Sequence, residues 1–214
     1  MRVFCVSDVH ASNTALQAIE KTLSSKKPDL LLVVGDTTHQ GKSSFINKFL
    51  PAMEKTKVPL LTIPGNMDEQ PVWKILEEKG ISIHAKKTVF RGASFVGFGG
   101  STHCPSPTPM EYDDGELYES IADLVDRQTI VVSHAPPFGT KADVTHAGKH
   151  VGCKSLRRLL EEKQPLACVS GHIHEAEGTD KIGDTVIVKV GAGKDGRAAW
   201  LELPSLKADY VKLF

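Results

Sequence analysis

Short apolar runs, each bounded by turn-forming residues, recur along this chain. Their β-branched character is typical of buried strands. Between them, apolar residues that recur three or four positions apart predict amphipathic helices. We predict strands over residues 3–6, 30–34, 58–63, 129–132 and 167–169, and helices around residues 13–23, 45–53, 72–76, 117–124 and 156–160.

The order of these elements indicates the fold class. Strands that alternate with helices predict a parallel sheet with right-handed crossovers. Further β-rich segments lie at 81–84, 88–91 and 93–98. Beyond residue 174 the pattern is typical of antiparallel strands, at 186–190 (after a turn at 182–185) and at 198–203. We therefore predict an α/β protein in which residues 1–214 form a single domain.

Composition narrows the class of protein. Apolar residues make up 40% of the 214 residues, which is enough for a sizeable core, and 26 basic residues balance 26 acidic ones. A net charge of zero gives no sign of a broad nucleic-acid or membrane surface, and no apolar run approaches the roughly 18 residues of a membrane span.

The four cysteines show no CxxC spacing, and Cys5 and Cys168 lie within apolar strands. We expect reduced thiols, no signal peptide before the first strand, and a cytoplasmic location; the oligomeric state is not readable.

Polar side chains follow the predicted strands directly. Because the carboxyl ends of parallel strands open onto one crevice, these side chains should meet there. Any one of the motifs could be an ordinary turn or a strand-end histidine, but five in register with strand ends predict a metal site. Carboxylate and amide oxygens with imidazole nitrogens suit Mn, Fe, Zn, Co or Ni. The segments are Asp8-Val9-His10, Gly35-Asp36, Gly65-Asn66, Ser133-His134 and Gly171-His172-Ile173-His174.

This ordered set resembles the calcineurin-like metallophosphoesterase superfamily over residues 3–174. Two further stretches, 99–101 and 133–141, resemble its branch of Icc-related predicted phosphoesterases. The resemblance implies two packed mixed sheets flanked by helices, a four-layer α/β/β/α sandwich. It also implies two divalent metal ions, with Mn favoured, and a hydroxide between them that attacks the phosphorus without a covalent intermediate.

The resemblance assigns the ligands of each ion. One ion would be bound by Asp8, His10, Asp36 and His174, and the other by Asp36, Asn66, His134 and His172, with Asp36 bridging the two. Asp36 and Asn66 thereby become catalytic as well as metal-binding residues.

One position departs from the family pattern. Many members have a histidine after Gly-Asn that protonates the leaving oxygen, whereas this chain has Met67. Such general acid catalysis is worth typically 10²–10⁴-fold. We interpret the neighbouring Asp68 as an N-cap for a helix that begins near Pro71, in preference to a role behind the metal ligands.

Several loop residues could still act on the substrate. We rank His150, between two glycines, first as a substitute acid and substrate contact, and we interpret His39, His103 and His146 as solvated loop histidines. Asn13 could contact the phosphate, although it or Ser12 is expected to cap the first helix.

Three loop or tail segments lack periodicity. We expect the Pro-rich residues 102–114 and residues 139–152 to form loops, the first of them ordered and near the site, and residues 205–214 to form a docked tail.

These observations leave three hypotheses for the function. The first is a dinuclear-metal phosphodiesterase that acts on a small or cyclic phosphodiester. The second is a phosphomonoesterase or protein phosphatase of the same fold, which Met67 disfavours. The third is a non-catalytic scaffold on this fold, which is disfavoured because every predicted ligand is present.

Overall fold

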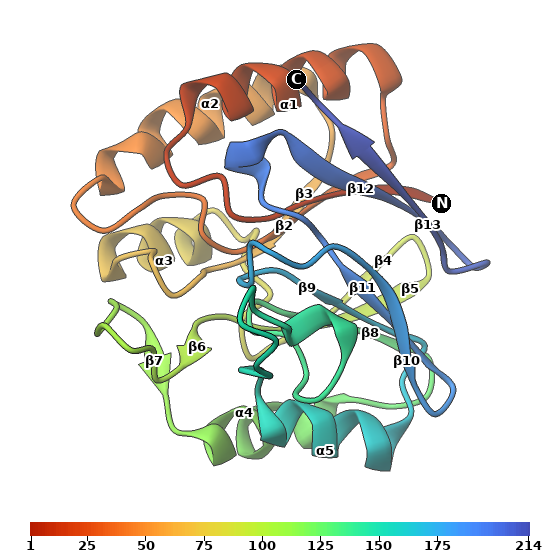
Figure 1. Ribbon diagram of the computed structural model, residues 1–214. Coiled ribbons are helices and arrows are strands. Elements are labelled where there is room, and N and C mark those ends of the chain that lie inside the picture. The colour runs from red at the N-terminus through yellow and green to blue at the C-terminus, as the bar shows by residue number, and fades with distance from the viewer.

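The computed structural model describes all residues 1–214, and two stacked sheets form its centre (Figure 1). The first sheet has five strands in the order β13-β12-β1-β2-β3. Its members β1, β2 and β3 run parallel, whereas β12 and β13 are antiparallel to their neighbours. The bounds are β1 Arg2–Val6, β2 Leu30–Val34, β3 Leu60–Ile63, β12 Arg197–Glu202 and β13 Lys207–Lys212.

The second sheet has six strands in the order β10-β11-β9-β8-β5-β4. Its four central strands are parallel, and the edge strands β4 and β10 are antiparallel. The bounds are β4 Lys87–Phe90, β5 Ala93–Phe98, β8 Thr129–Ser133, β9 Ala167–Ser170, β10 Gly178–Ile182 and β11 Thr185–Lys189. A separate parallel pair comprises β6 Ser101–Thr102 and β7 Glu111–Tyr112.

Helices cover the outer face of each sheet (Figure 1). α1 Asn13–Lys26, α2 Ile46–Thr56 and α3 Gln70–Glu78 lie on the first sheet, and α4 Asp114–Ile121 and α5 Lys154–Lys163 lie on the second. Ser12 caps α1, since its side chain accepts a hydrogen bond from the backbone N–H of Ala15, so Asn13 is the first residue inside the helix.

Strand alternation explains the layers, because successive side chains point to opposite faces of a sheet. Phe4 and Val6 of β1 pack against the helices, whereas Val3 and Cys5 face the second sheet. A third apolar cluster lies between the second sheet and α4 and α5. The structure thus confirms the expected α/β/β/α sandwich with mixed sheets.

Two segments show where local pattern and tertiary context differ. Residues 81–84 do not form a strand: Ser82 bridges to Thr62 of the first sheet and His84 to Gly97 of the second, so the backbone follows neither sheet for long. The predicted docked tail is confirmed, since β13 pairs with β12 along the edge of the first sheet. None of the helices has both the length and the apolar character that crossing a bilayer requires.

A buried lysine lies at the end of β11. Lys189 is 1% exposed, and its Nζ donates to the carbonyl of Val190 at 2.7 Å, its one hydrogen bond. Burial lowers the pKa of Lys189 from 10.5 to about 8, although the charge of Asp8 opposes this change. The folded state therefore bears a cost for the charged form, on the order of 3 kcal/mol at most.

Replacing this lysine will stabilise the fold in a pH-dependent way. Because the folded pKa lies below the unfolded value, the cost is complete below pH 8 and declines as the pH rises toward 10.5. We expect Lys189→Met to raise the free energy of unfolding by about 1–3 kcal/mol at pH 7, with a smaller gain at pH 10. Urea denaturation in the presence of a chelator measures this gain in unfolding free energy, with the exposed Lys181→Met as control. A gain that is independent of pH would contradict the assignment.

Candidate metal centre

The segments that follow β1, β2, β3, β8 and β9 meet at one edge of the two sheets. Several of their residues adopt a left-handed backbone that non-glycine residues rarely take, which is a recurrent feature of functional sites. The φ angle is +54° at Asp8, +49° at His10, +51° at Asp36 and +71° at His172. The surrounding structure must hold these residues in place.

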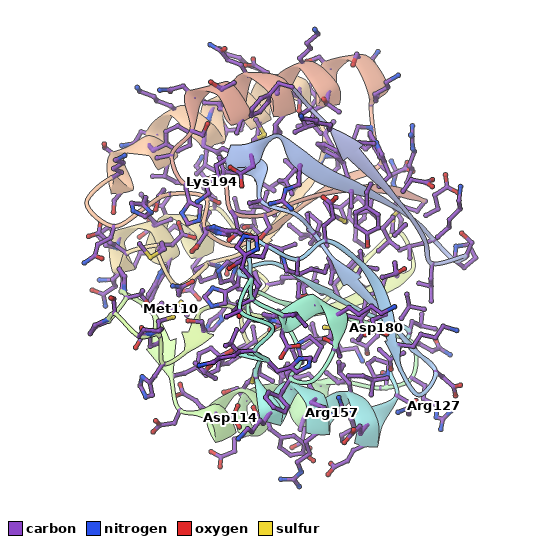
Figure 2. All side chains as sticks on the ribbon, viewed as in Figure 1. Met110, Asp114, Arg127, Arg157, Asp180 and Lys194 are labelled. Atoms are coloured by element: carbon purple, nitrogen blue, oxygen red, sulfur yellow. The ribbon has the colours of Figure 1, made fainter.

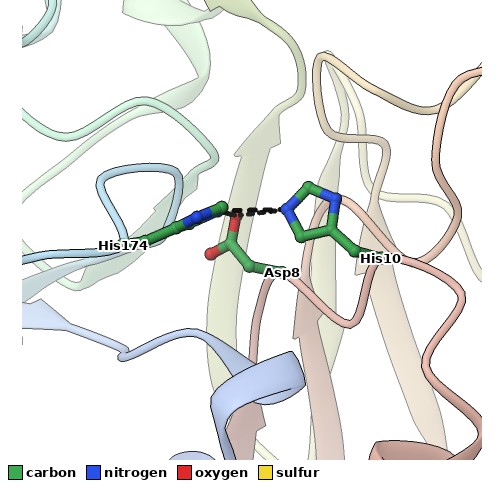
Figure 3. A group of neighbouring side chains, drawn as sticks. All are labelled: Asp8, His10 and His174. Atoms are coloured by element: carbon green, nitrogen blue, oxygen red, sulfur yellow. Dashed lines mark hydrogen bonds and ion pairs between the residues drawn. The ribbon is translucent and has the colours of Figure 1, made fainter.

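One group of donors is formed by Asp8, His10 and His174 (Figure 3). The Nε2 atoms of the two imidazoles are 3.0 Å apart. The Asp8 Oδ1 atom lies 3.3 Å from His174 Nε2 and 3.8 Å from His10 Nε2. These atoms come from segments far apart in the chain, after β1 and after β9, and they face a common point that a cation could occupy.

A second group is formed by Asp8, Asp36 and His134, which are all buried. Asp36 Oδ2 lies 3.4 Å from His134 Nε2 and 3.5 Å from His10 Nε2, so this oxygen stands between the two groups. Asn66 Oδ1 is 3.0 Å from His134 Nε2. The donors of the two groups therefore form one continuous cluster.

His172 completes the convergence of the predicted ligands. Its ring centroid is 5.1 Å from that of His134, and its backbone N–H donates to Asp8 Oδ2 at 3.0 Å. Every residue that the sequence nominated as a metal ligand thus lies in this cluster.

Glycines allow the loops to approach this closely. A Cβ atom at Gly65 would lie 2.0 Å from Asp36 Oδ1, and one at Gly35 would lie 2.4 Å from His134 Nδ1. Both contacts are shorter than any tolerated distance. The glycine that precedes Asp36 and the glycine that precedes Asn66 are therefore required by packing at the site itself, beyond their role in turns.

Burial and charge set the protonation of the imidazoles. Burial lowers the pKa of His10 to about 4 and that of His172 to about 3, so both are neutral and keep a free lone pair at neutral pH. Burial also opposes charge on His134, but the adjacent Asp36 carboxylate outweighs it and raises the pKa of His134 to about 9. Cation binding would displace the proton of His134, as is usual for imidazole ligands.

Asp68 corrects a sequence-based interpretation. It does not cap the following helix, which begins at Gln70 without a side-chain cap. Its buried carboxylate instead accepts hydrogen bonds from the backbone of Gly65 (2.8 Å), Thr37 (3.3 Å) and Thr38 (2.7 Å), and from the Thr38 hydroxyl (2.7 Å). A buried carboxylate needs such donors. Asp68 thereby ties the loop after β3 to the loop that carries Asp36.

The loop histidines lie in different environments from those expected. The interpretation of His39 as a solvated residue is wrong, since its Nδ1 is 3.2 Å from Nδ1 of His10. The Nδ1 atom of His150 contacts Asp143 Oδ1 at 2.7 Å, and its ring lies near Phe138, with no contact to the cluster in this structure. The sequence carried one signal for His39, its place in the turn that follows Asp36.

The other nominated residues, His103 and Asn13, are both exposed. His103 is exposed and pairs with Glu111 and Asp113, while Asn13 is exposed at the start of α1 without a hydrogen bond from its side chain. Met67 occupies the position at which many family members have a proton-donating histidine. Its side chain is half-buried, and its backbone N–H donates to Asp36 Oδ1 at 2.8 Å.

Segments from both halves of the molecule border the cluster, and Figure 2 labels one residue of each, Lys194 and Met110. The backbone N–H of Lys194 donates to the carbonyl of Asp8 at 3.0 Å, and that of Met110 to the carbonyl of Asn66 at 3.1 Å. A polar pocket adjoins His174, and it is lined by His146, His174, Glu175, Lys194, Asp195 and Arg197. The Pro-rich loop also reaches the site, because Cys104 Sγ is 4.0 Å from Asn66 Nδ2.

Known proteins are similar to this chain in sequence or in fold. MJ1162 of Methanocaldococcus jannaschii, described as uncharacterized, is 38% identical over 167 residues, which cover 75% of this chain and 76% of that protein. A protein of Arcobacter nitrofigilis named "Probable glycerophosphodiester phosphodiesterase GpdQ" is 24% identical over 206 residues, which cover 86% of this chain and 70% of that protein. The fold matches the crystal structure of TT1561 from Thermus thermophilus, with a TM-score of 0.77 at 19% identity, over 100% of this chain and 99% of that one.

A family match completes the comparison. The family model of calcineurin-like phosphoesterases matches residues 1–176, a span that includes every side chain of the cluster. This family is metal-dependent and hydrolyses phosphoric esters, in agreement with the Asp and His groups described above. The chain therefore belongs to the calcineurin-like phosphoesterase family.

Proposed function

We propose that this protein hydrolyses a small or cyclic phosphodiester with the help of two divalent metal ions. The observation that carries the proposal is the position of Asp36 Oδ2, which lies between His10 Nε2 and His134 Nε2 at 3.5 Å and 3.4 Å. A carboxylate in that place can bind two ions at once. Asp8, His10 and His174 would complete one site, and Asn66, His134 and His172 the other.

The donor set fits divalent ions of the first transition row. Two buried carboxylates and an amide supply oxygen, four imidazoles supply nitrogen, and no thiolate is a member of the cluster. This mixture favours Mn, Fe, Zn, Co or Ni, and we propose Mn as the native ion. When bound, such a pair of ions supplies a water-derived nucleophile at neutral pH and neutralises the charge of the phosphate.

The protein's own groups orient this site. Val34 fixes the ring of His134, because its carbonyl oxygen is 2.7 Å from Nδ1 and leaves Nε2 to face Asp36. Arg197 donates to the carbonyl of His174 and so fixes the segment after β9 that carries His172 and His174. These contacts hold the rings in place without occupying the nitrogens that face the cluster.

The preference for a diester rests on two supports. Met67 offers no proton to a leaving group, and poor leaving groups lose most from the absence of an acid. The name of the Arcobacter nitrofigilis relative also specifies a phosphodiester. A phosphomonoesterase or protein phosphatase is the second candidate, and a non-catalytic scaffold the third; the complete donor cluster speaks against the scaffold.

Metal reconstitution tests the proposal directly. Protein stripped with a chelator is titrated with Mn²⁺, its metal content is measured, and hydrolysis of bis(p-nitrophenyl) phosphate is followed. We expect about two ions per chain and activity that appears with the metal. A fully loaded protein without activity on any phosphate ester would favour the scaffold. One ion at saturation would refute the two-metal site.

A cytoplasmic location, a single domain and a small-molecule substrate stay predictions.

A further inference from the structure

His10 presents its two ring nitrogens to different surroundings. Nε2 faces the donor cluster, 3.0 Å from His174 Nε2 and 3.5 Å from Asp36 Oδ2. Nδ1 faces away from the cluster and lies 3.2 Å from Nδ1 of His39. The His10 and His39 rings meet edge to face, with centroids 5.2 Å apart and an interplanar angle of 73°. His39 is thus the residue that closes the outer side of the His10 ring.

We propose that His39 is a positioning residue for His10. Two nitrogens at this distance share one proton, since a pair of lone pairs or a pair of N–H groups would repel. A lone pair on the cluster side of His10 requires its proton on Nδ1, so Nδ1–H donates and the unprotonated Nδ1 of His39 accepts. His39 then carries its own proton on Nε2. The link to metal binding rests on the proposed function, whereas the hydrogen bond itself does not.

The backbone around His10 shows why it needs such support. His10 has a φ of +49°, a conformation that a side chain with a Cβ adopts only when neighbours impose it. Its N–H donates to the carbonyl of Asp36 at 2.9 Å, and the next residue, Ala11, donates to Thr37 at 3.2 Å. The loop after β1 is therefore aligned on the loop after β2, and the imidazole contact extends this alignment to the ring.

Asp68 fixes the backbone that leads into His39. The Asp68 carboxylate binds the backbone of Thr37 and Thr38, the two residues before His39. A continuous set of contacts therefore runs from the loop after β3, through the turn after β2, to the ring of His10. Histidine ligands of metals commonly depend on such a partner for tautomer and orientation, and removal of the partner typically weakens metal binding 10–100-fold.

Variants at position 39 test the proposal. In His39→Asn, the amide Oδ1 takes nearly the place of imidazole Nδ1 and can accept the same hydrogen bond. His39→Leu keeps the bulk but removes the acceptor. His103→Leu is a matched control, because His103 is 69% exposed and pairs with acids outside the cluster. The readouts are Mn²⁺ affinity by calorimetry and the tautomer of His10 in metal-free protein by long-range ¹H–¹⁵N correlation.

We expect His39→Leu to weaken Mn²⁺ binding 10–100-fold and to lower the Nδ1–H population of His10, while His39→Asn and His103→Leu stay close to wild type. The proposal is overturned if His39→Leu changes neither quantity, or if His39→Asn loses as much as His39→Leu. If wild-type protein binds no Mn²⁺, the proposed function fails, and the tautomer in the metal-free protein still decides whether His39 positions His10.

Discussion

Asp36→Asn will reduce phosphodiester hydrolysis by about 10³-fold or more and will lower the metal content of the purified protein. Asp36 Oδ2 is the oxygen placed between the two donor groups, and an amide replaces its charge with a neutral dipole of the same shape. This loss of rate corresponds to several kcal/mol of transition-state stabilisation that the metal ions would supply. Turnover of bis(p-nitrophenyl) phosphate and metal analysis of the same samples measure both effects.

Asn66→Ala supplies the contrast. Asn66 Oδ1 contacts only the His134 side of the cluster, so we expect this variant to lose affinity mainly for one ion and to retain the other. Asp29→Asn serves as a control for the chemistry of the substitution, because Asp29 contacts Arg2 at the end of β1 that is remote from the cluster. Full activity of Asp36→Asn at limiting Mn²⁺ would be incompatible with the two-metal site.

An activated aryl diester will be hydrolysed about 10²–10⁴-fold faster than an alkyl monoester such as glycerol phosphate. The reason is the residue at position 67: the thioether of Met67 has no proton to give, and an alkoxide leaving group needs one. The ratio of kcat/KM for bis(p-nitrophenyl) phosphate to that for glycerol phosphate measures the preference in the Mn-loaded protein. A wild-type protein that prefers the alkyl monoester would show that another group supplies the acid.

Two variants probe the source of that acid. Met67→His should shift the preference toward monoesters, but only in part, because Asp68 already accepts hydrogen bonds from Gly65 and Thr38 and is not free to orient a new imidazole. His150→Ala should slow poor leaving groups more than good ones if His150 substitutes for the missing acid. Its present contacts are with Asp143 and Phe138, so an equal effect on all substrates, or none, would remove His150 from the mechanism.

The residues proposed as metal ligands could be nominated from the sequence because their placement depends on strand ends. Asp8 follows β1 and Asp36 follows β2, and these two strands are parallel neighbours, so both residues reach the same edge of the sheet. His134 follows β8 in the second sheet and still meets Asp36 at 3.4 Å. Hydrophobic periodicity therefore predicted the strand ends at which these side chains lie and the helices beside them, whereas the sandwich was implied by the family resemblance.

Tertiary structure alone decided which residues contact the proposed ligands from behind. Asp68 precedes a helix, and its sequence context favours an N-cap, yet its carboxylate binds Thr37 and Thr38, about thirty positions earlier in the chain. His39 and His150 both lie in loops, and periodicity carries no information about the path of a loop. Only the folded chain shows that His39 meets His10 while His150 meets Asp143, because the neighbours of a loop residue are set by how loops from different strands pack together.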